Sequence, residues 1–154
     1  MVTEKPKYLI DSDILIALLR DTDNRTGLRQ KALNVGLQNC YVSALSLAEL
    51  SAGAYRMASG RGLFEVEFIK ELFNIHPFGL KRSADAECFG KNKALLYAAG
   101  IPIADMDLLI GSSALAGGFI MVTHNTRHFS HIPHLNIEDW LAESCGTNRP
   151  EGVE

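Results

Sequence analysis

Short apolar runs alternate with longer mixed segments along the chain. Residues 8–10, 40–42 and 119–122 are continuous in apolar side chains and are bounded by polar or turn-forming residues, which is typical of strands buried on both faces. Residues 74–76 and 135–137 are weaker examples of the same pattern. The pattern therefore predicts a sheet of about five short strands.

The segments between these runs have helical spacing. Ser43 and Asp13 precede apolar stretches and are predicted to be N-caps, whereas Gly36 and Gly100 stand where helices are expected to end. The predicted helices cover residues 14–19, part of 20–34, 44–58, 63–73, 83–99, 106–116 and 138–142. Strands that alternate with helices indicate a mostly parallel sheet covered on both faces. The predicted fold class is a three-layer α/β/α arrangement.

In a parallel sheet, functional groups gather beyond the carboxyl ends of the strands, near the point where the strand order reverses. The candidate segments in this chain are therefore residues 11–13 and 123–128, because both directly follow predicted strands.

Composition and charge narrow the class of protein. The chain has 154 residues, 47% of them hydrophobic and 21% charged, which fits one compact domain over residues 1–143 followed by a tail, 144–154, expected to be disordered. The formal net charge is 15 − 18 = −3, so any contact with nucleic acid must be local. No apolar run approaches the roughly 20 residues of a membrane-spanning helix, and no signal peptide is apparent. We expect a cytoplasmic protein without a membrane partner.

Cysteine and glycine patterns indicate no other common site. The three cysteines form no CxxC pair, so neither a disulfide framework nor a cysteine zinc site is predicted. His124 and His128 are four residues apart, but they directly follow a predicted strand, so a zinc site is not favoured. Neither GxxxxGK[ST] nor GxGxxG occurs, which leaves nucleotide hydrolysis without support.

Three carboxylates lie in apolar surroundings. Asp11 ends a predicted strand, Asp107 lies next to core residues at the start of a predicted helix, and Glu49 lies on a helix that is apolar on nearly every side and is expected to lack a solvated face. Buried carboxylates are costly unless they are paired or protonated. Acids that converge repel one another unless a divalent cation neutralises them, and oxygen ligands favour Mg²⁺ or Mn²⁺.

Simpler interpretations of the aspartates remain open at this point. Asp13 and Asp105 are more easily explained as helix caps than as ligands. Asp107 would stabilise a first helical turn through the helix dipole even without a function. Glu49 has no basic residue within one turn to pair with it, which favours a functional role.

Four segments in order resemble the PIN-domain ribonucleases, and specifically the VapC-type toxins of bacterial toxin–antitoxin pairs. Residues 8–16 resemble the family's first acidic strand, 46–50 its acidic helix, 102–110 its third acidic motif, and 122–129 with 132–140 its closing segment. Each motif alone is weak, but their order over nearly the whole folded chain is specific.

The resemblance implies a Mg²⁺-dependent endoribonuclease, with Mn²⁺ as an alternative ion. Asp11, Glu49 and Asp107 would hold the ion, which would activate a water for attack on an RNA phosphodiester. The resemblance also implies a homodimer and a cognate VapB-like antitoxin that inserts a peptide into the site.

The chain departs from the family pattern at two places. Asp13 stands where the family usually has asparagine, which adds a negative charge. Many relatives supply a fourth acid in the closing segment, where this chain offers Asn125 and His128. Asn125 is the expected fourth catalytic residue, because its side chain can orient a water.

Two other functions are kept as alternatives. The Asp-x-Asp at a strand end would also suit a haloacid-dehalogenase-like phosphatase with Asp11 as its nucleophile, although Glu49 would then be unexplained. A non-catalytic PIN-like binding subunit would keep the fold without turnover.

Overall fold

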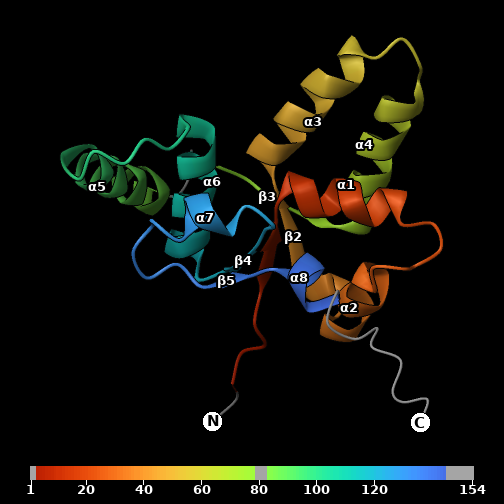
Figure 1. Cartoon of the computed structure of the whole chain (residues 1–154), viewed down its shortest axis with the longest axis horizontal. Helices are drawn as coiled ribbons and strands as arrows, with labels where there is room; N and C mark the ends of the chain where they lie inside the picture. Colours follow the sequence, from red (N-terminus) through yellow and green to blue (C-terminus); the bar gives the residue numbers. More distant parts are fainter. Residues whose placement is uncertain (1–2, 79–82, 145–154) are drawn as a thin grey trace, which may run out of the picture.

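A computed structural model describes residues 3–78 and 83–144 and shows a five-stranded parallel sheet between two layers of helices (Figure 1). The strand order is β3-β2-β1-β4-β5. The strands are β1 (Tyr8–Ile10), β2 (Cys40–Ser43), β3 (Asn74–His76), β4 (Ile120–Val122) and β5 (Ile137–Glu138). The predicted α/β/α class with a mostly parallel sheet is confirmed.

Strand β1 lies at the centre of the sheet because its three residues are buried and pair on both sides. Tyr8 pairs in parallel with Cys40 of β2 and with Ile120 of β4. The strand order reverses at this centre, since later strands are added first on one side of β1 and then on the other. The carboxyl ends of β1 and β4 therefore adjoin at the place where functional groups are expected.

Eight α-helices are present in the described part of the chain. Figure 1 shows α5, α6 and α7 on one face of the sheet and α1, α2, α4 and α8 on the other, with the α3–α4 hairpin projecting beyond the sheet. The helices are α1 (Ser12–Arg20), α2 (Leu28–Val35), α3 (Ala44–Arg56), α4 (Arg61–Leu72), α5 (Ser83–Ala98), α6 (Asp105–Gly117), α7 (Thr126–Phe129) and α8 (Trp140–Ser144).

Two hydrophobic cores hold these layers on the sheet. Ile10, Ile14 and Trp140 belong to the core beneath α1, α2 and α8. Leu9 and Leu108 belong to the core beneath α5, α6 and α7. Because successive residues of β1 contribute to opposite cores, both layers are anchored on the same central strand.

Most predicted helix ends agree with the structure. The Ser43 hydroxyl accepts a hydrogen bond from the amide of Leu45, as expected of an N-cap, and Gly36 ends α2 with a positive φ. Two predicted caps are wrong. Asp11, not Asp13, is the N-cap of α1, so that helix begins earlier than predicted. Asp105 is the first residue of α6 rather than its cap, and it binds the ammonium group of Lys93.

The shortest elements were predicted less well. Helix α7 was not predicted, and neither was the short 3₁₀ helix Leu37–Asn39. Strand β5 and helix α8 begin two residues later than predicted. These elements are two to five residues long, so they offer too little sequence for a period to be recognised. Ser144 ends α8, and the rest of the predicted tail lies outside the described residues.

Two further expectations concern the sequence as a whole. Within the described residues, none of the helices has the length and apolar character needed to cross a membrane. Cys40 and Cys88 are free thiols, and Cys40 is buried.

The contact between α6 and α7 requires a glycine at position 111. A Cβ atom on Gly111 would lie 2.4 Å from Ile132 Cδ1 and 3.1 Å from Phe129 Cδ1. Both neighbours are buried, so neither side chain can move away freely. The close approach of the two helices depends on this missing side chain.

We therefore expect Gly111→Ala to lower the free energy of unfolding by about 1–3 kcal/mol through overpacking. Gly53→Ala, in open space on α3, is the matched control and should leave stability unchanged or raise it by up to about 1 kcal/mol. Denaturant unfolding of both variants measures the two changes. Equal effects of the two substitutions would contradict this packing.

Candidate active site

Asp11 directly follows the central strand and begins the first helix. Its backbone amide continues the sheet by donating to the carbonyl of Val122 at 2.9 Å. Its Oδ1 accepts from the Ser12 amide at 2.9 Å, and its Oδ2 accepts from the Thr123 hydroxyl at 2.8 Å. The carboxylate is only 7% exposed, so these two donors fix its position in the protein.

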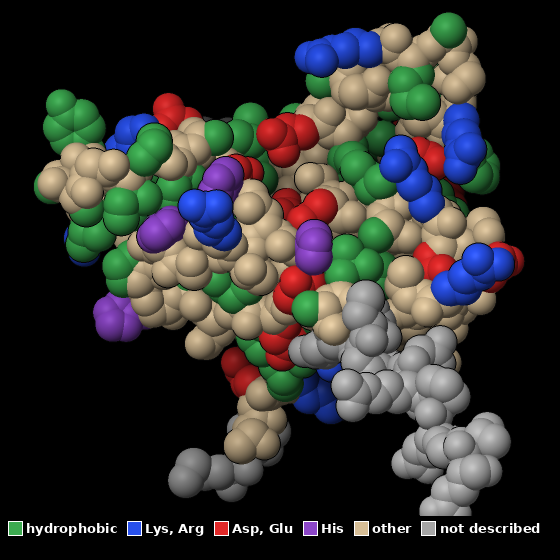
Figure 2. All heavy atoms as spheres, viewed as in Figure 1, with side chains coloured by type: hydrophobic (Ala, Val, Ile, Leu, Met, Phe, Trp, Pro, Cys, Tyr) green, Lys and Arg blue, Asp and Glu red, His purple; other side chains and the backbone are tan. Residues whose placement is uncertain are grey.

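Other acids lie close enough to Asp11 to repel its charge. Burial, then the charge of Asp13 and then that of Asp107, raise the pKa of Asp11 to about 6, although the hydrogen bonds from Thr123 and Ser12 oppose the shift. Figure 2 shows acidic side chains gathered near the centre of one face, between α3, α6 and the start of α1, with histidines beside them. The protein thus concentrates negative charge here despite a net charge of only −3.

Glu49 belongs to the same group, but its surroundings differ from the expectation. The prediction that it lacks a solvated face is wrong: Glu49 is exposed, as are Ala48 and Ala52 beside it on α3. The prediction failed because the apolar residues next to Glu49 are small alanines that lie on an exposed face of α3. Partial desolvation and the charge of Asp107 still raise the pKa of Glu49, which couples the two carboxylates.

The loop after β4 is attached to the acids by backbone and hydroxyl groups. Asp13 Oδ2 accepts from the amide of His124 at 3.0 Å, and the Thr123 hydroxyl accepts from the amide of Asn125 at 3.0 Å. Asp13 therefore positions the loop rather than capping a helix.

Thr123 is a site residue that the sequence analysis did not single out. It is fully buried and contacts Asp11 directly. The register explains the contact, because Ile10 pairs with Val122 and the next residue of each strand is Asp11 or Thr123. The position of a threonine directly after the strand that pairs with β1 could have indicated this contact from the sequence.

Asn125 and His128 face each other and together approach the third acid. Asn125 Nδ2 lies 3.0 Å from His128 Nδ1, and the same nitrogen of His128 lies 3.8 Å from Asp107 Oδ2. Asn125 precedes α7 and His128 lies within it, so this short helix brings both side chains to the acidic group. His128 is therefore the residue that connects this pair to Asp107.

His124 makes a separate pair with an aspartate. Its Nδ1 lies 3.0 Å from Asp139 Oδ2, and the imidazole is 62% exposed. Asp139 Oδ1 accepts from the amides of Leu141 and Ala142, which holds this carboxylate at the start of α8. The imidazole is thus oriented by a fixed acid and keeps one edge open to solvent.

The acids fit a hydrated magnesium ion better than a metal that is bound only by protein atoms. Within residues 3–78 and 83–144, no group of three or more histidine, cysteine, aspartate or glutamate side chains forms a ready-made ligand set. Mg²⁺ commonly keeps several waters and binds through one or two carboxylates plus substrate phosphates. Asp11, Glu49 and Asp107 provide oxygen donors whose mutual repulsion a cation would relieve.

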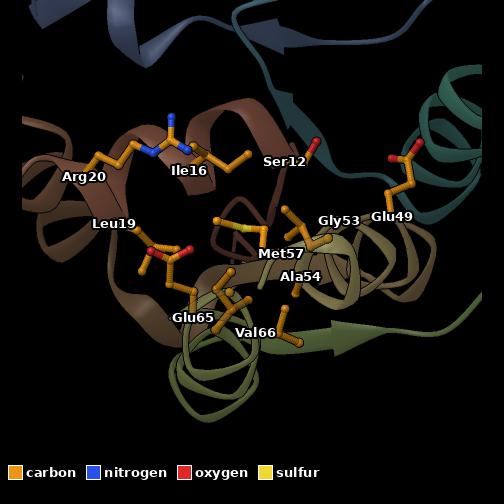
Figure 3. A pocket seen from close by; sticks show the side chains of 13 residues that line it. Ser12, Ile16, Leu19, Arg20, Glu49, Gly53, Ala54, Met57, Glu65 and Val66 are labelled. Atoms are coloured by element: carbon orange, nitrogen blue, oxygen red, sulfur yellow. The ribbon is translucent and has the colours of Figure 1, made fainter. Parts of the chain in front are cut away.

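A hollow of about 420 Å³ extends from this site along α1, α3 and α4. Figure 3 shows Glu49 at one end, Met57 and Ala54 in the middle, and Arg20 and Glu65 towards the opposite end. The lining is mainly apolar, so the acidic site continues directly into a surface suited to an apolar partner.

Comparisons with known proteins agree with this geometry. The model of the PIN domain family matches residues 8–135. The chain is 31% identical to "Ribonuclease VapC" of Rickettsia bellii, over 84% of this chain and 92% of that protein. It is 27% identical to "tRNA(fMet)-specific endonuclease VapC" of Salmonella typhimurium, over 87% and 98% of the two chains. A solved structure of DNA-bound VapBC from Salmonella typhimurium superposes with a TM-score of 0.78 at 26% identity, covering 88% and 98%.

The raised pKa of Asp11 makes stability depend on pH. Between pH 4 and pH 6 the folded protein holds this proton more tightly than the unfolded chain, so the stability contributed by the neutral form is lost as pH rises through about 6. Without divalent cations, Asp11→Asn should therefore be more stable than the wild type at pH 7 by about 1–3 kcal/mol. The difference should vanish below pH 4.

Denaturant unfolding in EDTA across this range measures the effect. Asp23→Asn, at an exposed surface pair with Arg25, is the control and should show no such trend. An Asp11→Asn protein that is less stable than the wild type at pH 7 would show that the carboxylate serves mainly as a helix cap.

Proposed function

Because the chain belongs to the PIN domain family, and within it to the VapC ribonucleases, we propose that it is a metal-dependent endoribonuclease and the toxin of a toxin–antitoxin pair. One observation supports this function most directly. Asp11, Glu49 and Asp107 come from three separate elements and are electrostatically coupled at the carboxyl end of the sheet. Such an arrangement is unfavourable for stability, and a bound cation would offset the repulsion between the carboxylates.

Asp11, Glu49 and Asp107 would hold Mg²⁺, or Mn²⁺ in its place, and the first two differ in their surroundings. When bound, the ion supplies a Lewis acid for a phosphate oxygen and makes a bound water more acidic. Asp11 is oriented by Thr123 and Ser12 and keeps further lone pairs on both oxygens for the ion and its waters. Glu49 is exposed and would hold the ion from the solvent side of the site.

In this proposal Asn125 orients the attacking water. Its Nδ2 faces His128 Nδ1, which leaves its Oδ1 as an acceptor for a water hydrogen. His128 lies beside Asp107 and occupies one of the two positions at which the family resemblance implies a fourth acid. We therefore assign Asn125 to the water and His128 to the support of Asn125.

The alternative functions explain fewer of these contacts. A phosphatase with Asp11 as its nucleophile would leave Glu49 without a role and would place its later acid after a strand, whereas Asp107 lies in the first turn of α6. A non-catalytic PIN-like subunit needs no coupled acids, and an RNA cleavage assay separates it from the nuclease.

The hollow beside Glu49 is the proposed docking place of the VapB-like antitoxin. The solved Salmonella structure is a DNA-bound VapBC, and the similar structure from Mycobacterium tuberculosis is described as a member of the VapBC family of toxin–antitoxin systems. A partner segment seated along Met57 and Ala54 would reach Glu49 at the end of the hollow and so block the acids. Inhibition and substrate binding would then compete for Glu49.

A homodimer and a cytoplasmic location are further parts of this proposal. Helix α5 exposes Tyr97 and Leu95, with 86% and 51% of their surface accessible, and α3 exposes Tyr55. Exposed large apolar side chains of this kind are typical of protein interfaces. An intracellular RNA target requires the enzyme to remain in the cytoplasm.

Replacing Glu49 by Gln separates catalysis from packing. The change keeps the shape of the side chain and removes a charge that Asp107 repels, so metal-free stability should be unchanged or slightly higher. Cleavage of RNA with Mg²⁺ should fall by about 100-fold or more, because a ligand of the ion is lost. Glu67→Gln, at an exposed pair with Lys70, is the control and should cleave normally. A destabilised but active Glu49→Gln protein would refute the assignment.

Filling the hollow should uncouple toxicity from neutralisation. Gly53 lines it with open space around its Cα, so Gly53→Phe should fold normally and obstruct the partner. Expressed alone, the variant should still arrest growth, whereas co-expressed antitoxin from the neighbouring reading frame should no longer relieve the arrest or co-purify. Gly90→Phe, on α5 and also in open space, is the control and should remain neutralised. Equal neutralisation of both variants would place the antitoxin elsewhere.

A further inference from the structure

The pair of His124 and Asp139 is not used by the proposed metal chemistry. His124 follows Thr123, the residue that holds Asp11, and its own amide is fixed by Asp13 at 3.0 Å. Its backbone therefore has a fixed position at the edge of the acidic site. A carboxylate that orients an exposed imidazole beside such a site needs an explanation.

Asp139 determines which nitrogen of His124 carries the proton. A carboxylate accepts hydrogen bonds only, so Nδ1, at 3.0 Å from Asp139 Oδ2, is the donor. In the neutral imidazole the other nitrogen, Nε2, is then an acceptor. Because 62% of the side chain is exposed, Nε2 is accessible to a bound molecule.

The surroundings of His124 favour a neutral hydroxyl over a phosphate as the group that Nε2 meets. Asp13 and Asp139 contact this residue, and Asp11 lies one hydrogen bond beyond Thr123. These acids create a negative potential that disfavours a phosphate group beside His124. The hydroxyl group that distinguishes RNA from DNA is the ribose 2′-OH, which can donate to such an acceptor.

We propose that His124, with its tautomer fixed by Asp139, accepts a hydrogen bond from a ribose 2′-hydroxyl near the bond that is cut. This inference rests on the proposed function and deepens it, because it makes His124 a residue that selects RNA over DNA. Asp139 is then a positioning residue that acts through His124.

Substrates with single sugar changes test the inference. In an RNA oligonucleotide that the wild type cleaves at pH 8, replacing one 2′-hydroxyl at a time by hydrogen or fluorine removes the donor. One position near the cut should lower kcat/KM roughly tenfold, the worth of one lost hydrogen bond. His124→Ala should show a similar loss on the unmodified RNA and no further loss at that position. His131→Ala, an exposed histidine on the same segment, should keep the wild-type pattern.

Asp139→Asn tests the tautomer without removing the helix cap. An asparagine oxygen still accepts from the amides of Leu141 and Ala142, while its NH₂ group faces Nδ1 and makes Nε2 the donor. The penalty for 2′-fluorine at the sensitive position should therefore shrink. A purely structural role would lower kcat/KM equally on every substrate and leave the penalty intact, which would overturn the inference.

Other outcomes are also decisive. If the loss of kcat/KM caused by a neutral methylphosphonate linkage depends on His124, and the loss caused by a 2′-deoxy sugar does not, His124 contacts phosphate. The inference then fails, while the proposed nuclease function remains. If the wild type cleaves no RNA, the proposed function fails. The ¹⁵N resonance of His124 Nε2 in Asp11→Asn protein then decides the inference, because it should shift with an RNA oligonucleotide and not with the DNA of the same sequence.

Discussion

The position of the Asp11 carboxylate is the constraint on which the rest of the site depends. Asp11 directly follows the central strand, whose residues belong to the cores on both sides of the sheet, and only 7% of this residue is exposed. Burial of a charge is costly, and one hydroxyl and one amide offset part of this cost here. The same two contacts begin helix α1 and attach β4 to β1, which joins the folding of the sheet to the geometry of the acids.

The acids differ in their exposure to solvent, and this difference determines how strongly each carboxylate is destabilised. Asp11 is buried, and its pKa is raised to about 6 mainly by desolvation. Glu49 stands at the open edge, where water partly screens its repulsion from Asp107. A cation of the kind proposed for this site would reach Glu49 from solvent and would relieve the larger penalty at Asp11. Burial increases from Glu49 to Asp11, so a cation would approach these like charges from the side of Glu49.

The loop after β4 supplies the other wall of the site and connects it to neighbouring surfaces. Thr123, His124 and Asn125 are each held by a different contact, to Asp11, to Asp13 and to the Thr123 hydroxyl. Close packing of α7 on Gly111 keeps His128 near Asp107. On the far side, Glu49 is shared with the apolar hollow of α1, α3 and α4. The proposed substrate selection and the proposed inhibition would therefore involve opposite walls of one acidic centre.

The sequence by itself determined the fold class and the order of the main elements, and it singled out the acids at positions 11, 49 and 107 as candidate site residues. Continuous apolar runs and capping residues are local signals, and an acid beside such a run is visible without coordinates. The tertiary structure decided which aspartate caps α1, that Glu49 is exposed, and that Thr123 and Asp139 contribute to the site. The contacts of Thr123 and Asp139 depend on register and packing between β1, β4 and α8, segments more than 100 residues apart in the case of Asp11 and Thr123. No local pattern encodes such a distance, because a hydrogen bond across a sheet depends on the alignment of two strands and not on the sequence of either one.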